Sequence, residues 1–409
     1  MAPEIDPARL LRRLDELAAF GATPAGGVDR QALSEPEIAA RRYVLDIAAA
    51  RGFRSFVDPI GNLFLRREGT DPSLPPVVAG SHLDSQPRGG RYDGALGVMA
   101  ALECLEAIDD AGLVHRPPVE VVAWTNEEGS RFAPGAMGSM AYSGAKPLAE
   151  LLASRDAEGI AVADALPAVL AATPEAAPRP LGAPLAAYLE LHIEQGPVLE
   201  AEGLPVGIVT GIQGARWFEV SVSGEAGHAG TTPEAFRKDA FVAAQRIIAE
   251  LRAALVDPED RTRFTIGRFA LHPGSVNTIP AEATFSVDLR HPEEDRLDAL
   301  EAAVRRIVAD RAAPCRATVR PLLTIPGRRF PDRITELCAE AVRDCGFPER
   351  RLVSGAFHDA QFIAGICPAG MIFVPCRGGI SHNEAEHVEP EHAVAGTRVL
   401  LAALLRLVM

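Results

Sequence analysis

Residues 80–94 read GSHLDSQPRGGRYDG, and this stretch decides the fold that we expect for the chain. It follows the apolar run PVVA at residues 76–79, which is typical of a buried strand. The strand therefore ends in His82, and a glycine-rich loop then returns the chain to Asp93. Both side chains are common metal ligands, so the stretch predicts a strand end that delivers a metal site.

The pattern around this stretch predicts an α/β domain. A helical segment at about residues 94–112 leads to another apolar strand at 119–124, which indicates a sheet buried on both faces. A further apolar strand, residues 185–192, again ends in a histidine. Residues 153–183 are rich in Ala and Pro and predict no definite element.

The pattern changes between residues 213 and 328, where the expected order is β-α-β-β-α-β. This is the order of a ferredoxin-like α+β unit. The final segment again combines helices with an apolar strand, as the first domain does. We therefore expect a mixed-sheet α/β catalytic domain formed by residues 1–212 and 329–409, interrupted by an inserted lid or dimerisation domain over residues 213–328.

Composition narrows the class of partner. The formal net charge of -14 argues against nucleic acid and against an anionic membrane surface, because both attract basic proteins. Six cysteines form no C-x-x-C pair and indicate reduced thiols. The acidic N-terminal residues are atypical of a signal peptide, and no apolar stretch is long enough to cross a bilayer. A cytoplasmic protein acting on a small molecule is the expectation.

Ligand-type side chains recur at the ends of the apolar strands or in the loops beyond them. These residues are His82, Asp93, Glu127 or Glu128, His192 and His382. Ligands of open α/β sheets collect at the carboxyl ends of the strands. Imidazole and carboxylate together favour zinc, with manganese, cobalt or nickel as alternatives.

The residue types also suggest separate roles. Asp93 is the candidate to bridge two metal ions, because it is expected between two segments that carry histidines. Two such ions together activate a water molecule and polarise a carbonyl. Asp84 lies on the same side of an extended strand as His82 and is expected to orient its imidazole. Neighbouring side chains point in different directions, so one glutamate can ligate while the other faces the water, and the division we prefer is Glu128 as the ligand and Glu127 as the general base.

Each of these residues taken alone fits an ordinary structural role. A single histidine at a strand end is more often a structural residue than a ligand, and Glu-Glu-Gly is usually a turn. The combination is harder to assign to chance, because three histidines and two acidic sites follow apolar strands in three separate parts of one domain.

The motifs together resemble the M20-type metallo-aminoacylase and carboxypeptidase clan. The resemblance covers nearly the whole chain and is closest to the amidase branch, which contains N-carbamoyl-L-amino-acid amidohydrolases, β-ureidopropionases and allantoate amidohydrolases. Histidine rather than a carboxylate at position 192 favours this branch over the peptidases. The motifs are GSHLDS (80–85), GGRYDG (89–94), TNEEGSRF (125–132), ELHIEQGP (190–197) and GGISHNE (378–384).

The resemblance implies two divalent metal ions per subunit. One is held by His82, Asp93 and His192, and the other by Asp93, Glu128 and His382. Glu127 is then the catalytic base. All of these positions are filled in this sequence.

The resemblance also implies residues that contact the substrate. His228, in a polar loop, is expected to stabilise an oxyanion in the active site of the other subunit of a homodimer. Arg290 is expected to hold a substrate carboxylate through its planar fork, although at a strand end it is otherwise typical of a surface charge. The remaining substrate-side candidates are Gln195, Arg216, Asn277, Gly355, Ala356 and His358.

The expected activity is hydrolysis of an N-carbamoyl-L-amino acid to the amino acid, ammonia and carbon dioxide. Allantoate is the second candidate substrate because it also joins a ureido group to a carboxylate, and N-acyl amino acids or dipeptides come third. A non-catalytic binding protein on the same scaffold is the alternative from another class. An intact Glu127 argues against it, because a binding role does not require a base that holds no metal.

Overall fold

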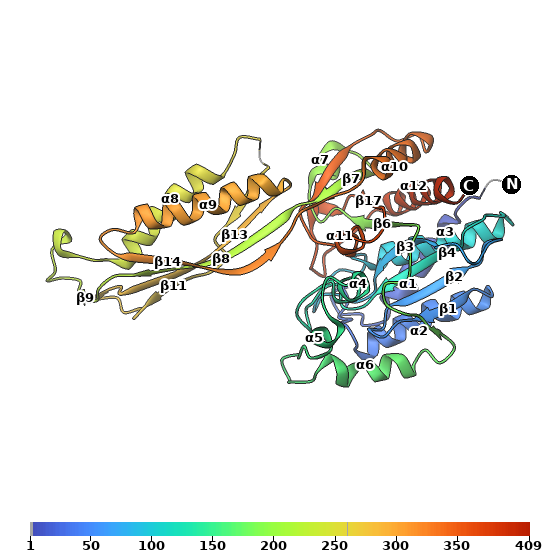
Figure 1. Ribbon diagram of the computed structural model, residues 1–409, viewed down its shortest axis with the longest axis horizontal. Coiled ribbons are helices and arrows are strands. Elements are labelled where there is room, and N and C mark those ends of the chain that lie inside the picture. Colours follow the sequence, from blue (N-terminus) through green and yellow to red (C-terminus); the bar gives the residue numbers. More distant parts are fainter. Residues whose placement is uncertain (1–2, 260) are drawn as a thin grey trace. The chain divides into compact units, whose positions relative to one another are not determined.

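The computed structural model describes residues 3–259 and 261–409. The chain forms two compact units, which we describe separately (Figure 1). The larger unit contains the residues up to Thr210 together with Phe330–Met409, and the smaller unit is Gly211–Arg329. Within the described ranges, no helix combines the length and the apolar character that crossing a membrane requires.

The larger unit is built on a mixed sheet with four parallel strands at its centre. The strand order is β15-β7-β17-β6-β3-β4-β2-β1-β5, and β16 also pairs with β7. Strands β17, β6, β3 and β4 are parallel, whereas β7 and β2 flank them in the antiparallel direction. The strands of the sheet are β1 (Arg54–Val57), β2 (Leu63–Arg67), β3 (Val77–His82), β4 (Val119–Trp124), β5 (Ala177–Pro178), β6 (Ala187–Ile193), β7 (Gly207–Ile212), β16 (Arg351–Ser354), β17 (Ala369–Val374) and β15 (Arg328–Arg329), whose two residues fall within the residue range of the smaller unit.

Every residue of the four central strands is buried, as expected for parallel strands covered on both faces. Helix α3 is buried along almost its whole length because it packs against β3 and also against α1 and α12. The helices of this unit are α1 (Pro7–Ala18), α2 (Glu35–Ala50), α3 (Ala95–Asp110), α4 (Met137–Ser143), α5 (Leu148–Leu152), α6 (Val162–Ala171), α7 (Val198–Glu202), α10 (Asp332–Asp344), α11 (Asp359–Ile363) and α12 (Pro390–Val408).

Apolar clusters of buried side chains stabilise the larger unit. The main cluster joins the sheet to α1, α2, α3, α10 and α12. A second cluster joins α4, α5 and α6, and it includes Val162, Leu166 and Val169. Residues 153–183 therefore contain a helix that the sequence pattern did not indicate. Its apolar residues pack against neighbouring helices, and this packing cannot be read from the local sequence. The expected α/β fold with a mixed sheet is confirmed.

The smaller unit has an antiparallel sheet whose one face is covered by two helices (Figure 1). The strand order is β10-β13-β8-β14, and β11 also pairs with β13. Alternate residues of β8 and β13 are buried against the helices, which gives this sheet one apolar face. The elements are β8 (Gly214–Ser223), β9 (Gly227–His228), α8 (Ala240–Leu255), β10 (Arg263–Thr265), β11 (Phe269–His272), β12 (Thr278–Ile279), β13 (Glu282–His291), α9 (Glu294–Arg311) and β14 (Arg316–Ile325).

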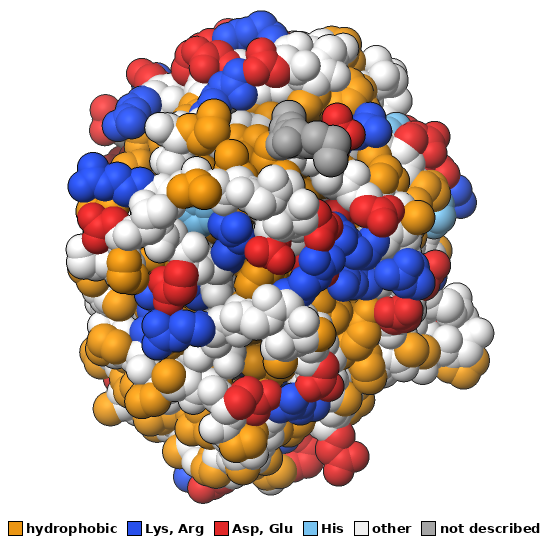
Figure 2. Space-filling view, turned by 90° about the vertical axis from the view of Figure 1, so that its right-hand side faces the viewer, with side chains coloured by type: hydrophobic (Ala, Val, Ile, Leu, Met, Phe, Trp, Pro, Cys, Tyr) orange, Lys and Arg blue, Asp and Glu red, His pale blue; other side chains and the backbone are white. Residues whose placement is uncertain are grey.

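One face of the molecule, drawn in Figure 2, carries both acidic and basic side chains. On the face drawn in Figure 2, basic side chains (blue) lie beside acidic ones (red), and a short run of adjoining basic side chains lies to the right of the centre.

Candidate active site

The candidate site lies at the carboxyl ends of the parallel strands. His82 is the last residue of β3, and His192 lies near the end of β6. Glu127 and Glu128 follow β4, and His382 lies in the loop after β17. Because all four strands run in the same direction, their ends meet at one edge of the sheet, where ligands of α/β proteins bind.

Three of the expected ligands form one compact group, His82, Asp93 and His192. One ligand atom from each residue lies within 4.8 Å of the other two. The Nε2 atom of His192 is 3.1 Å from Oδ1 of Asp93, and the Nε2 atom of His82 is 3.7 Å from the same oxygen. Two imidazoles and a carboxylate at this spacing suit a divalent transition metal.

Asp93 also belongs to a second group, with Glu128 and His382. The Nε2 atom of His382 lies 3.5 Å from Oδ2 of Asp93 and 3.3 Å from Oε2 of Glu128. The two oxygens of Asp93 therefore face two different groups. This is the arrangement of a carboxylate that bridges two metal ions.

The hydrogen bonds of the two buried histidines support metal binding. Nδ1 of His82 lies 2.9 Å from the backbone oxygen of Asp84, and Nδ1 of His192 lies 3.0 Å from the backbone oxygen of Ile193. A proton on Nδ1 leaves Nε2 as the free acceptor, and Nε2 is the atom that faces Asp93 in both residues. The residues present therefore fit two divalent ions.

The orientation of His82 differs in one respect from the expectation. Its ring is held by the backbone oxygen of Asp84, whereas the Asp84 carboxylate is farther away, at 3.7 Å. That carboxylate instead accepts hydrogen bonds from the backbone N–H groups of Glu127 and Glu128, each at 3.2 Å. Asp84 therefore connects the end of β3 to the loop after β4.

The two glutamates have different surroundings, as expected of neighbours with separate roles. The Glu128 carboxylate accepts hydrogen bonds from the backbone N–H of Gln86 at 3.0 Å and from its side-chain amide at 2.8 Å. Glu127 is 8% exposed, and its Oε2 lies 3.5 Å from Nε2 of His82. Glu128 is thus fixed in the second ligand group, and Glu127 lies beside the first.

The loop that returns Asp93 to the strand end is shaped by close contacts. At Gly94, where φ is 64°, a Cβ atom would lie 2.3 Å from the ring of His82. Glycine is therefore required by both the left-handed backbone and the available space. The carboxylate of Glu386 accepts the backbone N–H groups of Tyr92 at 2.9 Å and Asp93 at 3.0 Å.

Two further side chains hold Asp93 itself. Ser381 Oγ and Gln195 Nε2 donate to Oδ2 of Asp93 at 2.8 Å and 2.9 Å. Glu386 and Ser381 were not among the residues expected from the sequence, although both lie within five residues of His382. Their role depends on contacts with the Asp93 loop, which is far away in the chain.

Backbone strain is concentrated at the site. Asn126, Gln195 and His382 have φ values of 54°, 55° and 54°, in the left-handed region that residues other than glycine seldom adopt. Each of them immediately precedes or carries a functional side chain. Such strain persists only where surrounding contacts impose it, and it is commonly found at active sites.

A further buried carboxylate lies behind the histidines. Glu190, two residues before His192 on the same strand, accepts Ser81 Oγ at 2.7 Å, the Tyr188 hydroxyl at 3.1 Å and the Ala360 N–H at 3.0 Å. The period of two along a strand was a signal that could have identified it. The site thus contains more carboxylates than the two metal-ligand groups that share Asp93.

Burial and this excess of negative charge change the pKa values of Glu127 and Glu128. Burial and the charges of Asp359 and Glu128 raise the pKa of Glu127 well above its ordinary value. Burial and the charge of Asp93 likewise raise the pKa of Glu128 well above its ordinary value. Divalent cations would relieve this repulsion, because their charge is the largest in such a site.

The two histidines respond in opposite directions. Burial lowers the pKa of His82 to about 4. Burial also acts to lower the pKa of His192, but its hydrogen bond to Asp93 and the charge of that residue outweigh the effect and raise the pKa to about 9. Without metal, the imidazole of His192 is therefore protonated on both nitrogens and positively charged at neutral pH.

We expect metal binding to release protons and to strengthen as the pH rises from about 7 towards 9. A protonated His192 cannot ligate, so a metal ion must displace a proton whose pKa is about 9. Calorimetric titration of the metal-free protein with Zn²⁺ in buffers of different ionisation enthalpy measures the release. The exposed His272→Gln variant is the control. An observed enthalpy that is the same in every buffer would contradict the prediction.

His358 lies directly against the first ligand group. Its ring centroid is 4.4 Å from that of His192, and its Nε2 is 2.9 Å from the hydroxyl of Ser354. Burial, with the charge of His192, keeps the pKa of His358 well below its ordinary value. Gly355 and Ala356 lie in the same loop, and the Ser354 hydroxyl donates to the backbone oxygen of Ala356 at 2.9 Å.

In the smaller unit, the structure brings His228 and Asn277 together. Strands β9 and β12 pair so that His228 lies opposite Thr278, and the N–H of Ala229 donates to the backbone oxygen of Asn277 at 3.0 Å. The His228 side chain is exposed, and its Nδ1 accepts the N–H of Gly230 at 3.0 Å. The Nε2 atom of His228 takes no part in this hydrogen bond.

The two arginines of the smaller unit differ in their surroundings. Arg290 is partly buried in β13 and its Nη2 lies 2.9 Å from the carboxylate of Asp288. Arg216 is 5% exposed, and its guanidinium forms ion pairs with acids of α9, including Asp298 at 3.0 Å and Glu301 at 3.5 Å. Arg216 therefore has a set of acidic partners within its own unit that the sequence did not indicate.

Comparison with known proteins gives consistent matches. Residues 78–406 match peptidase family M20/M25/M40. An N-carbamoyl-L-amino-acid amidohydrolase of Geobacillus stearothermophilus is 40% identical over 400 residues, 96% of each chain. One of Rhizobium meliloti is 38% identical and covers 97% of this chain and 95% of its own. A crystal structure of a hydantoinase/carbamoylase family amidase from Burkholderia multivorans has a TM-score of 0.94 at 41% identity, covering 100% of this chain and 99% of its own.

The chain belongs to peptidase family M20/M25/M40. The resemblance that the sequence motifs indicated is thereby confirmed, and the match extends across both compact units.

Proposed function

We propose that the protein is a metal-dependent amidohydrolase that hydrolyses the ureido C–N bond of N-carbamoyl-L-amino acids. The products are the amino acid, ammonia and carbon dioxide, and one water molecule is consumed. The single observation that carries the proposal is the pair of ligand groups sharing Asp93, with Glu127 beside them. The near-full-length relatives that carry this activity in their names support the choice of substrate.

The metal residues have a defined place in this proposal. His82, Asp93 and His192 would hold one divalent ion, and Asp93, Glu128 and His382 would hold the other, with zinc as the first choice and manganese, cobalt or nickel as alternatives. When bound, the two ions supply Lewis acidity, which acidifies a water molecule and polarises the ureido carbonyl.

Glu127 performs the proton transfers. Its carboxylate takes a proton from the attacking water and then delivers it to the departing nitrogen of the substrate. Burial and neighbouring acids raise its pKa in the absence of metal, and the charge of bound cations would favour the ionised form that a base requires. The Asp84 carboxylate positions it by accepting the Glu127 N–H.

The proposal also assigns residues that contact the substrate. Arg290 binds the substrate carboxylate, Asn277 binds beside it, and His228 stabilises the oxyanion. In the larger unit the contacts come from Gln195 and from the loop of Gly355, Ala356 and His358. Arg216 is a further candidate for substrate binding, although its guanidinium is paired with acids of α9 in its own unit.

We further propose that residues 213–328 form a ferredoxin-like lid and dimerisation domain between catalytic segments 1–212 and 329–409. The order β8, α8, β10 with β11, β13, α9, β14 supports this interpretation, as does the antiparallel strand order β10-β13-β8-β14. The protein would act as a homodimer in which His228 reaches the active site of the neighbouring subunit.

A substrate panel tests the activity. The metal-loaded protein is assayed for ammonia release from N-carbamoyl-L-amino acids, N-carbamoyl-β-alanine and allantoate, with zinc or manganese added. We expect the highest kcat/KM for an N-carbamoyl-L-amino acid. A higher value for allantoate would reassign the substrate, and no turnover of any ureido compound would contradict the proposal.

Mixed dimers test the shared active site. We expect inactive His228→Ala and Glu127→Gln subunits to regain activity when combined, reaching about half of the wild-type value per mixed dimer. One of the two sites then contains an intact Glu127 and an intact His228 from the partner. The measurement is turnover by mixed dimers purified through two different affinity tags.

The matched control combines Glu127→Gln with His382→Ala subunits. Both residues belong to the same larger unit, so neither site in this mixed dimer is complete. Activity in the control dimer, or its absence in the His228→Ala combination, would show that the sites are not shared as proposed.

A further inference from the structure

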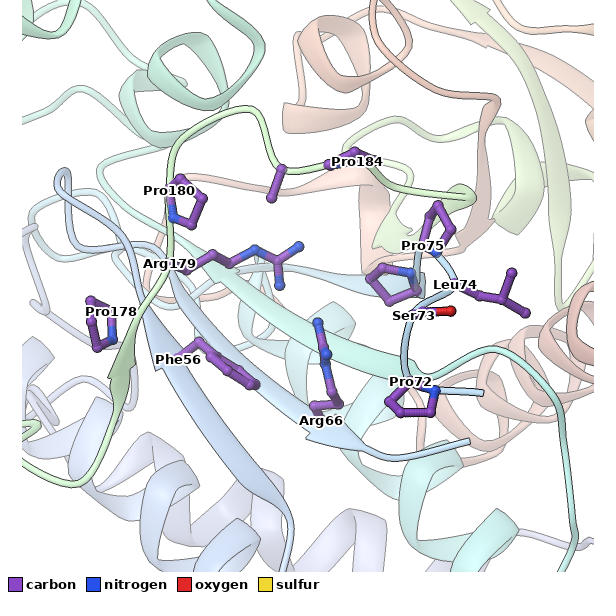
Figure 3. Close-up of a pocket in the computed structure, with 12 residues that line it drawn as sticks. Phe56, Arg66, Pro72, Ser73, Leu74, Pro75, Pro178, Arg179, Pro180 and Pro184 are labelled. Carbon is purple, nitrogen blue, oxygen red and sulfur yellow. The ribbon is translucent and has the colours of Figure 1, made fainter. Parts of the chain in front are cut away.

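A pocket in the larger unit is lined by residues near the amino-terminal ends of the parallel strands, whereas the candidate metal ligands lie at their carboxyl ends (Figure 3). Its walls come from the loops that precede β3 and β6 and from β1 and β2. Pro76 immediately precedes β3, whereas His82 ends it, so the length of the strand, roughly 17–20 Å, separates the pocket from the metal site. The pocket has a volume of about 300 Å³, at the lower end of the range for small-molecule sites.

The lining combines apolar walls with positive charge. Figure 3 shows the guanidinium groups of Arg66 and Arg179 pointing into the space between Phe56 and the proline-rich loops. Of the described residues that line the pocket, none is acidic. The apolar lining consists of Phe56, Leu74, Ala183 and prolines 72, 75, 76, 178, 180 and 184.

The two arginines are fixed from behind by one carboxylate. Glu120 in β4 is fully buried and accepts hydrogen bonds from Nε of Arg66 and Nη1 of Arg179, each at 2.6 Å. Nη2 of Arg179 donates to the Tyr142 hydroxyl at 2.9 Å. Two guanidinium groups thus share a single carboxylate as their hydrogen-bond partner, and buried Asp58 adds a second negative charge that acts on Arg179.

Arg179 has unused hydrogen-bonding capacity although it is buried. The residue is only 6% exposed, and its Nε atom has no hydrogen-bond partner among the described residues. Leaving a buried donor of a charged group without a partner is costly, so such donors normally have one. The positions of Arg66 and Arg179 are also restrained by aromatic rings, with Arg66 4.8 Å from the centre of Phe56 and Arg179 4.0 Å from that of Phe64.

We propose that this pocket binds a small organic carboxylate at a site separate from the metal centre. The carboxylate would accept hydrogen bonds from the two guanidinium groups, whose planar shape matches its oxygens. An apolar body would contact Phe56 and the prolines. The charged residues of the described lining are the two arginines, so a ligand with its own ammonium group would find no acid among them.

The experiment measures binding of 4-fluorobenzoate to the metal-loaded full-length protein by fluorine NMR. We expect saturable binding that Ala183→Phe abolishes, because the new ring fills the pocket. Arg66→Gln should weaken it roughly tenfold or more, since a hydrogen bond to a charged group is lost. Arg66 is chosen over Arg179 because it is less buried and does not contact Tyr142.

Three controls distinguish binding in this pocket from binding at the metal centre and from non-specific anion binding. His382→Ala, which alters only the metal centre, should leave binding unchanged. Neutral 4-fluorobenzamide should not bind, and inorganic phosphate should not displace 4-fluorobenzoate at equal concentration. Melting temperature and metal content verify that the two pocket variants are folded.

The proposal is overturned by any of four results. These are no saturable binding to the wild-type protein at millimolar concentrations, undiminished binding in either folded pocket variant, loss of binding in His382→Ala, and equal binding of the amide or of phosphate. Because none of the readouts is turnover, the result is independent of the proposed hydrolytic activity.

Discussion

Replacing Glu127 with Gln is expected to lower kcat by roughly 10²- to 10⁴-fold, the usual contribution of a general acid–base group. The amide keeps the size of the side chain but cannot accept a proton from water. Its position is expected to be retained, because Asp84 holds the Glu127 backbone N–H rather than its carboxylate. The measurements are steady-state kinetics and metal content by atomic emission.

Metal content distinguishes catalysis from binding in this variant. Glu127 belongs to neither of the two ligand groups that share Asp93, so Glu127→Gln should retain its metal ions. Glu150→Gln, at an exposed position in α5, is the matched control and should behave as the wild-type protein. Full activity of Glu127→Gln would remove the base from the mechanism and would favour a different assignment of the site.

Replacing Asp93 with Asn is expected to remove both metal ions and with them all measurable turnover. Asp93 belongs both to the ligand group of His82 and to that of His382. An amide presents one oxygen acceptor and no charge, so it cannot bridge two cations. The loss should exceed the roughly 10- to 100-fold decrease in metal affinity that follows removal of a residue that only orients a ligand.

The matched control for this change is Asp310→Asn, at an exposed position in α9. Zinc affinity is measured by competition with a chromophoric chelator. If Asp93→Asn retained two metal ions with wild-type affinity, Asp93 would not be the bridge. Retention of one ion would assign Asp93 to only one of the groups.

Much of the site could be predicted because its chemistry is local to short motifs. His82 and His192 end apolar strands, and parallel strands that end in ligand-type residues place them at one edge of a sheet. The separate roles of Glu127 and Glu128 followed from the opposite directions of neighbouring side chains. The structure gives the two glutamates different partners, and their separate roles stay a prediction.

Other parts of the site could not be predicted because they depend on long-range contacts. Glu386 holds the backbone of Asp93 although the two residues are 293 positions apart in the sequence. Asp84 illustrates a finer error, since its backbone oxygen rather than its carboxylate holds His82. Sequence patterns specify which face of a strand a side chain occupies but not which atom of a neighbour it meets.

The residue types at the site, the strand ends that carry them and the family of the motifs could all be read from the amino-acid sequence. These are properties of short segments, and hydrophobic periodicity and motif spacing express them directly. Folding in three dimensions was needed to show that Asp93 faces two ligand groups and that Gly94 must lie against the ring of His82. The same is true of Arg66 and Arg179, which converge on Glu120 at the other end of the sheet. The physical reason is that the packing of distant segments sets these distances, and no local pattern records it.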